Sequence, residues 1–579
     1  MVSKEEASVG FSTATDNGIA AVATREDDAS VAKEALSPYA EYGQTKRGLT
    51  PRHVQLMTLG GAIGTGLFAG IGGVLSKAGP ASLVLGFVIW SVAFVWPCNL
   101  AVAEMVAYLP IRGSIFELAS RFVDPAMGFA MGWTYFYTCV MLVCVEYSAV
   151  ATVMQFWIQD VNPAAWIAMA MVVCVLLNVV AVKWFGETEF FMASTKLLLI
   201  VFLVSLTIVT MCGGNPRHDA YGFRNWNGGH AMLTYQVHEP ESLGRFLGVL
   251  KAITYACFSV NGPDMMALAA GEIQNPRRTI PRMARLIFYR LAAFYIIGVL
   301  AVGIICEARD KNLIGALDSG VGTGAGASPW VIGIKNLGIT GLPDMINAFI
   351  LLSGWSCGNA YLYASSRTLY GLARDGQAPR IFMRCNSSGV PVYCVMAVTL
   401  ISCITFLVSS TSAATVFFWF VDLTTTGLIA TYTAMLVVYL GWFRARKAQA
   451  GDDVPDGVLH PAHESRLPYI APWGPWPACG ALFLGCSALL FVGFDSLNPF
   501  KTQGFITSYF CLPYSAALFA FWKVYRRTRL VRPREADLIS GKAEIDAESR
   551  VWEEGGLDEN WRAHLAGMPF FRRCWERIW

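Results

Sequence analysis

The strongest constraint on the fold is a set of long apolar segments that recur along most of the chain. Twelve such segments occur, at approximately 53–76, 80–109, 126–158, 164–182, 189–212, 246–273, 286–306, 341–372, 391–410, 412–441, 476–495 and 504–526. Each is long enough to cross about 30 Å of hydrocarbon, and none shows the alternation of a membrane barrel strand. Only 15% of the residues are charged. The sequence therefore predicts an all-α integral membrane protein with twelve transmembrane helices.

Basic residues are concentrated in alternate loops, which sets the expected orientation. Clusters follow the sixth, eighth, tenth and twelfth segments, and examples are Arg277, Arg278, Arg282, Arg374, Arg380, Arg444, Lys447, Arg526 and Arg527. Loops rich in lysine and arginine face the cytosol. We therefore expect a disordered cytosolic N-terminal tail at 1–48, a twelve-helix domain at 49–526 and a cytosolic C-terminal tail at 527–579.

Composition and motifs exclude several classes of function. The net charge is +3, which gives no reason to expect a nucleic-acid partner. The 15 cysteines are scattered, so no metal or other cofactor is expected. No phosphate-binding Gly-x-x-x-x-Gly-Lys-Ser/Thr run occurs, which argues against direct ATP drive. The few histidines lie mostly in loops without a nucleophile beside them, so we do not expect an enzyme.

Two of the apolar segments contain residues that break helices. The first holds four glycines within residues 60–66, and the sixth holds Asn261, Gly262 and Pro263 at its centre. Alone, such glycines are typical of close helix packing and such a proline of a kink. The two breaks are five helices apart, however, at matching positions of two halves. This pattern predicts a transporter built from an inverted repeat of five plus five helices, followed by two more.

The breaks also predict a binding site for a zwitterion. Unwound backbone at membrane depth is tolerated where it lines a cavity. The amides of Gly64, Thr65 and Gly66 lie at the start of a half-helix and suit a carboxylate. The carbonyls that end the preceding half of the sixth helix, near Phe258 and Ser259, suit an ammonium group. A new half-helix is expected to begin at Pro263, with Asn261 or Gly262 as its cap.

Charged residues inside the apolar segments are costly and should face protein or water. Glu146 lies in the third segment and is either a buried polar strut or a proton carrier. Asp264 follows the second break, where it either complements the helix dipole or contacts a substrate ammonium or a proton. Lys196 lies in the fifth segment and is either a proton-coupling group or a residue that extends to the cytosolic face. Tyr135, Phe417 and Asp422 are candidates for the wall of the pocket.

Four long stretches, in order, resemble the fungal amino acid permeases of the amino acid–polyamine–organocation superfamily. They are GLTPRHVQLMTLGGAIGTGLFAGIGGVL, AEMVAYLPIRGSIFELASRFVDPAMGFAMGW, AAGEIQNPRRTIPRM and SSRTLYGLARDGQAP. The resemblance runs from about residue 46 to 526. It implies a LeuT-like fold with discontinuous helices 1 and 6, and proton-coupled uptake of amino acids across a fungal plasma membrane. It also implies that Ala62, Ile63 and the residues through Gly66 hold the substrate backbone, together with Phe258 through Gly262, and that Lys196 occupies a sodium position.

The chain departs from these permeases in its acidic residues. Gly262-Pro263-Asp264 replaces a common Gly-Thr-Glu, and Asp422 replaces a common asparagine. A basic amino acid, a polyamine or carnitine is therefore an alternative substrate, and a non-transporting amino acid receptor on the same scaffold is an alternative function. We expect an amino acid or related amine, protons and membrane lipids as partners. Ubiquitin on Lys4, Lys33 or Lys46 and palmitate on Cys574 are further possibilities for the tails.

Overall fold

The protein is described by a computed structural model. It describes residues 63–111, 114–158, 160–179, 182–227, 229–270, 273, 275–318, 328–386, 389–409, 413–449, 467–542 and 545–546. Within these residues all regular secondary structure is helical, apart from an isolated bridge between Leu497 and Phe500. The expected helical class is confirmed. The N-terminal tail, the first half of helix 1 and the end of the C-terminal tail lie outside the described residues.

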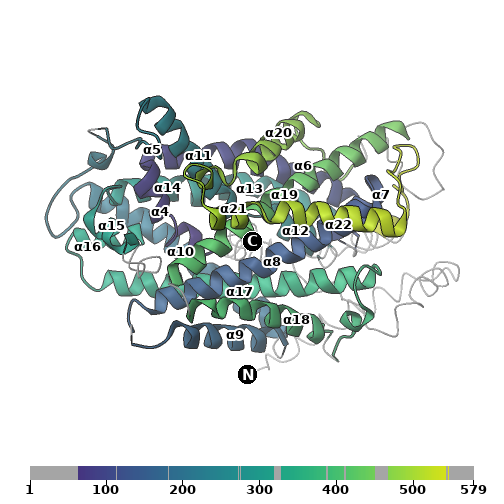
Figure 1. Ribbon diagram of the computed structural model, residues 1–579, viewed down its shortest axis with the longest axis horizontal. Coiled ribbons are helices and arrows are strands. Elements are labelled where there is room, and N and C mark those ends of the chain that lie inside the picture. Colours follow the sequence, from purple (N-terminus) through teal and green to yellow (C-terminus); the bar gives the residue numbers. More distant parts are fainter. Residues whose placement is uncertain are drawn as a thin grey trace, which may run out of the picture.

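Figure 1 shows the helices in their order along the chain. They are α4 (Gly72–Ala78), α5 (Pro80–Trp90), α6 (Trp96–Tyr108), α7 (Ser114–Phe122), α8 (Pro125–Met154), α9 (Pro163–Val179), α10 (Val182–Met211), α11 (Glu241–Ser259), α12 (Pro263–Ala269), α13 (Pro276–Arg290), α14 (Ile297–Ile305), α15 (Lys311–Asp318), α16 (Pro329–Asn336), α17 (Leu342–Arg374), α18 (Val392–Ser402), α19 (Ala413–Ala448), α20 (Trp476–Phe491), α21 (Thr502–Tyr509) and α22 (Cys511–Arg526). Single π-helical turns at Ser91–Val95 and Leu291–Ile296 join α5 to α6 and α13 to α14.

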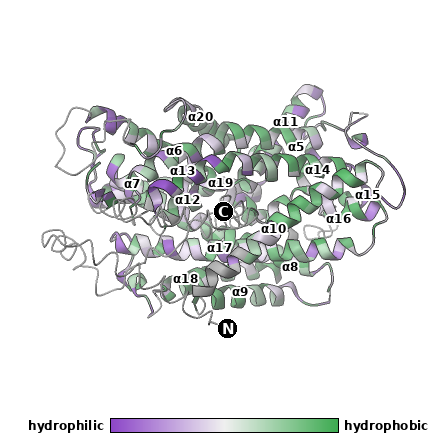
Figure 2. Cartoon of the chain, turned by 180° about the vertical axis from the view of Figure 1, so that it is seen from behind, coloured by the Kyte–Doolittle hydropathy of each residue, from purple (hydrophilic) through white to green (hydrophobic). Residues whose placement is uncertain are grey.

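Seven helical spans in the described residues are long and apolar enough to cross a membrane, or eight if the bent pair α21 and α22 forms one span. Figure 2 shows the middle of the assembly mostly in the colour of apolar residues, with polar residues gathered toward its two ends. The chain is therefore a multi-pass membrane protein. The predicted second, third, fifth, sixth, seventh, tenth and eleventh segments each coincide with one of the seven spans. The count of twelve crossings stays a prediction.

Local sequence explains where several spans begin. Pro80, Pro125 and Pro276 each occupy the first turn of a helix, where a missing N–H is tolerated and the fixed φ is suitable. Asp124 caps α8, because its carboxylate accepts a 2.8 Å hydrogen bond from the amide of Ala126. Lys523 also forms an ion pair with this carboxylate, which ties the end of α22 to the start of α8.

The spans pack as two groups. The bundle group contains α4, α5, α6, α11, α13 and α14, and the platform group contains α8, α9, α17 and α18. In Figure 1 the platform group lies along the bottom and most of the bundle group along the top. Helices α19 and α22 pack on α8, and α20 packs on α19. Helix α10 contacts both groups, through α17 and α14.

Candidate functional site: two helix breaks in the bundle group

The first break lies at the start of the described chain. Gly64 has an extended backbone, and only a single buried 3₁₀ turn follows, at Thr65–Leu67. Regular α-helix resumes at Gly72, later than the sequence predicts. Because these residues are not in an α-helix, the amides near Thr65 are free of the usual helical partners.

The second break matches its prediction closely. Helix α11 ends at Ser259, and α12 begins at Pro263 with Gly262 as the N-cap. Gly262 has φ +154°, which favours glycine. The side-chain Nδ2 of Asn261 donates a 3.0 Å hydrogen bond to the carbonyl of Phe258, and Arg290 of α13 donates a 3.1 Å hydrogen bond to the carbonyl of Asn261. The unwound segment is therefore held by defined polar contacts.

The two breaks lie against each other. The hydroxyl of Tyr255 in α11 donates a 2.8 Å hydrogen bond to the carbonyl of Gly66. A Cβ added at Gly66 would lie 2.8 Å from a ring carbon of Phe258 and 3.1 Å from the hydroxyl of Ser259. Phe258 and Ser259 are themselves buried. The segments that the sequence predicts to hold a substrate are thus brought together.

A carboxylate of the protein itself accepts hydrogen bonds from the backbone and side chain of the first break. The Thr65 amide lies 3.3 and 3.4 Å from the two carboxylate oxygens of Glu146, and the Thr65 hydroxyl donates to one of them at 2.9 Å. Glu146 comes from α8 of the platform group and is 2% exposed. The place predicted for a substrate carboxylate is therefore filled by an internal one in this conformation.

Glycines make room for this carboxylate. A Cβ at Gly64 would lie 2.1 Å from Glu146 Oε1, and a Cβ at Gly354 of α17 would lie 2.7 Å from the Thr65 methyl group and 3.2 Å from Glu146 Oε2. Such approaches are shorter than van der Waals contact allows. Ile63 is also buried here, and its carbonyl accepts a 3.2 Å hydrogen bond from Ser353. Ala62 lies outside the described residues.

Lys196 is buried in α10 rather than extended to a membrane face. The carboxylates of Glu146 and Glu189 both attract its charge. Glu189 accepts a 2.8 Å hydrogen bond from Ser356 of α17. Sequence reasoning missed Glu189, although its position seven residues before Lys196 places both on one face of a helix.

Asp264 connects the second break to two tyrosines on neighbouring spans. Tyr135 of α8 donates to one carboxylate oxygen at 3.0 Å, and Tyr432 of α19 donates to the other at 2.7 Å. Asp264 is 1% exposed. Tyr135, a predicted wall candidate, therefore takes part in this contact. Tyr432 and Arg290 were not predicted, because nothing in the sequence indicates which buried polar residues lie at the same depth in the membrane.

The two remaining wall candidates lie elsewhere along the spans. Phe417 is buried, and its ring lies 3.4 Å from where a Cβ at Gly70 would be, beside the turn before α4. Asp422 lies in electrostatic range of Lys251, Asp495 and Lys77. In that group Lys251 of α11 forms an ion pair with Asp495, near the end of α20. We call the four residues Lys77, Lys251, Asp422 and Asp495 the lysine–aspartate cluster.

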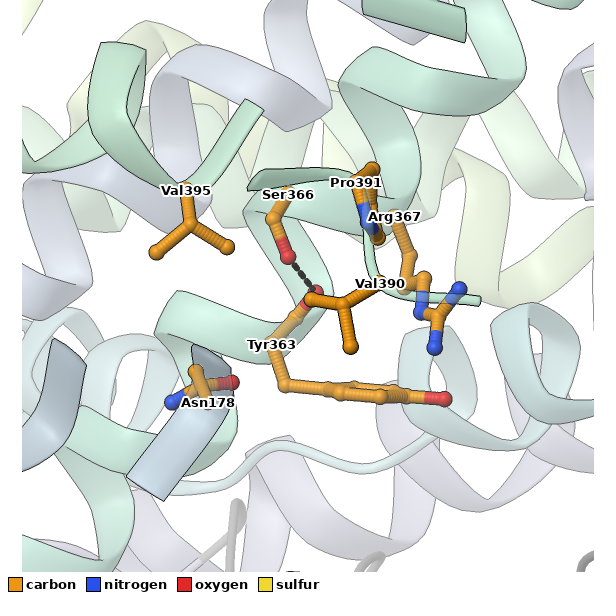
Figure 3. A pocket seen from close by; sticks show the side chains of 7 residues that line it. All are labelled: Asn178, Tyr363, Ser366, Arg367, Val390, Pro391 and Val395. Atoms are coloured by element: carbon orange, nitrogen blue, oxygen red, sulfur yellow. Dashed lines mark hydrogen bonds between the residues drawn. The ribbon is translucent and has the colours of Figure 1, made fainter. Parts of the chain in front are cut away.

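A small pocket lies away from both breaks, between α9, α17 and α18 (Figure 3). Its lining residues are Asn178, Tyr363, Ser366, Arg367, Val390, Pro391 and Val395. The guanidinium of Arg367 lies 5.1 Å from the ring centre of Tyr363, and the Ser366 hydroxyl donates to the Tyr363 carbonyl at 2.8 Å. None of its lining residues belongs to the bundle group, so it is separate from the predicted site.

Comparisons with known proteins assign the chain to a family. The model of the family described as "Amino acid permease" matches residues 53–533. The chain is 40% identical to a "Proline-specific permease" of Emericella nidulans, with 87% of this chain and 90% of that protein covered. It is 37% identical to a "Proline-specific permease" of Saccharomyces cerevisiae, with 89% and 81% covered. It is 32% identical to a "Lysine-specific permease" of the same yeast, with 90% and 82% covered. The chain belongs to the amino acid permease family and is a transporter rather than an enzyme.

Proposed function

We propose that this permease imports an amino acid into a fungal cell by alternating access, in symport with protons. The observation that carries the proposal is the meeting of two unwound segments of the bundle group against Glu146 of the platform group. A site between two packed groups becomes accessible from one side or the other when the groups move relative to each other. The twelve-crossing, LeuT-like inverted repeat and the domain limits at 48/49 and 526/527 are part of this proposal.

The substrate carboxylate takes the place of Glu146 at the amides of Gly64, Thr65 and Gly66. Support comes from the present geometry, since the Thr65 amide and hydroxyl already bind a carboxylate. The substrate amine is accepted by the carbonyl ends of α11 near Phe258 and Ser259. The Ser259 hydroxyl is buried and makes no hydrogen bond of acceptable geometry within the described residues, so it is a further acceptor. Ala62, Ile63 and Gly262 complete the backbone frame.

Proton coupling follows from the displacement of Glu146. A carboxylate that leaves the Thr65 amide loses its hydrogen bonds in a buried place, and a proton is the simplest compensation. Lys196 is the second coupling group, because Glu146 and Glu189 both attract its charge. Asp264 is the third, although its two tyrosine donors support a structural contact equally well. Phe417 and Asp422 form the outer wall of the pathway.

L-Proline is the substrate we propose. The support is that two relatives are proline-specific permeases, together with the crowding at the breaks, where added Cβ atoms at Gly64 and Gly66 would collide with neighbours. A basic amino acid is the rival substrate, because another relative carries a lysine-specific name and the chain has the acidic outer residues Asp422 and Asp495. The uptake assay described below also tests a polyamine or carnitine as the substrate and the hypothesis of a non-transporting receptor.

We propose that the protein lies in the plasma membrane with its arginine-rich helix ends on the cytosolic side and the lysine–aspartate cluster on the outer side. The basic residues at the helix ends support this orientation, since Arg277 lies in the first turn of α13, Arg374 ends α17 and Arg526 ends α22. We call this end of the assembly the basic end. Ubiquitin machinery would act on the tails from this side.

The test is uptake into vesicles that contain only this protein. An inward proton gradient should drive accumulation of radiolabelled L-proline, and a protonophore should abolish it. Lysine, spermidine and carnitine serve as competitors. Empty vesicles and the Glu146→Gln variant are the controls, and the variant should lose accumulation at least about tenfold while keeping its thermal unfolding midpoint.

The outcomes separate the alternatives. Accumulation of lysine, spermidine or carnitine without accumulation of proline would show that the substrate is a cationic compound of this kind and not proline. Specific proline binding without any transport would support the receptor. Gradient-independent equilibration of proline would remove the proton symport.

A further inference from the structure

Beyond the helix breaks, the part of the chain that follows α22 packs across the basic end. The described residues 531–542, 545 and 546 are here called the strap. Leu538 and Lys542 are each 1% exposed, and Ala536, Ile545 and Asp546 are 4–5% exposed. In Figure 1 the yellow trace beyond α22 turns back at the right-hand end of the assembly. Part of the C-terminal tail that the sequence predicts to be cytosolic is therefore buried against the helices.

One half of the strap is fixed to α7, to the turn before α8 and to the end of α19. The amide of Val531 donates a 2.9 Å hydrogen bond to the carbonyl of Val123, between α7 and α8. Arg121 of α7 donates to the carbonyl of Ser540 at 2.8 Å and lies 3.5 Å from the carboxylate of Asp537. Gln449, directly after α19, donates to the carbonyls of Pro533 and Ala536 at 3.0 and 2.8 Å.

The other half is fixed to the bundle group. The hydroxyl of Tyr108, the last residue of α6, donates to the carbonyl of Leu538 at 3.2 Å. The ammonium of Lys542 lies 4.5 Å from the centre of the Tyr108 ring. Arg277, in the first turn of α13, forms an ion pair with Asp546, and both side chains are largely buried. The strap thus bridges the ends of α6 and α13 to α7 and α19.

We propose that the strap is a latch that holds the basic end closed and must release α6 and α13 before substrate can leave there. The inference rests on the proposed alternating access, in which the bundle and platform groups separate at one end at a time. The strap binds α6 and α13 of the bundle group on one side, and α7 and α19, which pack on α8 of the platform group, on the other. A segment bound in this way resists separation of the two groups by the free energy of its contacts. The strap therefore sets the population of the conformation that is open at the basic end, and anything that binds the released tail would accelerate transport.

Hydrogen–deuterium exchange on the full-length protein in lipid nanodiscs tests the latch directly. Asp546→Arg places a like charge against Arg277 and Lys542, and Leu538→Asp puts a charge in a buried place. In both variants the strap amides should exchange at least about tenfold faster. If the strap is a latch, amides in α6 and the first turns of α13 should also exchange faster, while α9 should not change.

Matched variants control for misfolding. Glu535→Arg changes an exposed strap residue whose pairing with Arg532 is also exposed, and it should behave as the parent does. The double variant Arg277→Asp with Asp546→Arg restores an opposite-charge pair and should restore slow exchange. Rescue of this kind is not expected from a general loss of stability.

Transport gives the second readout. In vesicles, the two releasing variants should raise the initial rate of proline efflux at least about threefold over the parent. If the strap amides of the variants exchange faster while those of α6 and α13 exchange at the parent's rate, the strap is only packing and the latch is overturned. The latch is also overturned if the parent transports proline and the variants show the same efflux rate as the parent. A parent that does not transport proline would refute the proposed function, while the exchange data would still decide whether the strap couples to α6 and α13.

Discussion

At the scale of single residues, the site depends on glycines that admit side chains from other helices. Gly64 is the clearest case, because its backbone is extended and needs no glycine for conformational reasons. What requires glycine there is space, since a Cβ would lie 2.1 Å from Glu146 Oε1 and 3.0 Å from Cys357 Sγ. The residue therefore links the first break to α8 and α17.

Gly64→Ala should displace the Glu146 carboxylate from the Thr65 amide and lower proline uptake at least about tenfold, at an overpacking cost of about 1–3 kcal/mol. Gly371→Ala is the matched control, because the added Cβ would meet nothing within 4 Å. Adding Glu146→Asp to Gly64→Ala withdraws the carboxylate and should recover part of the uptake. Full activity of Gly64→Ala, measured at equal protein in the membrane, would contradict this geometry.

Lys542 is the second residue with a measurable consequence. Burial lowers the pKa of its ammonium from 10.5 to about 8, while the carboxylate of Asp546 opposes this change and the guanidinium of Arg277 adds to it. The Tyr108 ring also faces the ammonium. A docked strap therefore binds the proton less tightly than a released one, and docking should strengthen as pH rises between about 8 and 10.5.

Between pH 7 and pH 9 the docking equilibrium should rise roughly tenfold in favour of the docked strap. The measurement is the protection factor of the strap amides, which already corrects for the intrinsic pH dependence of exchange. Lys542→Met carries no charge, so its protection should be higher than that of the parent at pH 7 and should not vary over this range. Equal pH dependence in both proteins would refute the assignment to Lys542.

At the scale of helices, the sequence predicted what local chemistry determines. The second break was predicted to within a residue because Pro263 can begin a helix but cannot continue one, and because Gly262 accepts a positive φ. The end of the first break was not predicted correctly, because regular α-helix begins only at Gly72. Residues 65–71 contain no feature that distinguishes a 3₁₀ turn from an α-helix.

Which residues meet across helices was harder to predict. Glu146 was predicted as a strut or a proton carrier, and its hydrogen bonds to Thr65 are compatible with both. Tyr255, Tyr432 and Arg290 were missed, because their roles depend on rotation and depth of helices far apart in sequence. The apolar residues around them bury every face of α8, so periodicity does not identify the face that carries Glu146.

At the scale of the whole molecule, polar contacts lie on both sides of the breaks, along the pathway proposed above. Toward the basic end, Asp264 of α12 is held by Tyr135 and Tyr432 from α8 and α19. Toward the other end, Asp495 pairs with Lys251 of α11, and its backbone carbonyl accepts a 3.1 Å hydrogen bond from Gln236. Both sets join the α11–α12 span to helices outside the bundle group, so each resists opening at its own end.

Weakening one set should therefore favour opening at that end and oppose opening at the other. Tyr432→Phe removes a hydrogen bond to a buried carboxylate, worth about 1.5–3 kcal/mol, and should shift the population about tenfold or more toward the conformation open at the basic end. Asp495→Asn should shift the population the opposite way.

Hydrogen exchange measures this shift. Amides in α12 and α13 should exchange faster in the first variant, and amides in α4 and α11 should exchange faster in the second. In uptake assays the apparent affinity for external proline should fall in the first and rise in the second, since only the outward-open conformation binds it from that side. If both variants move exchange at the same end, the two sets of contacts do not act as opposing gates.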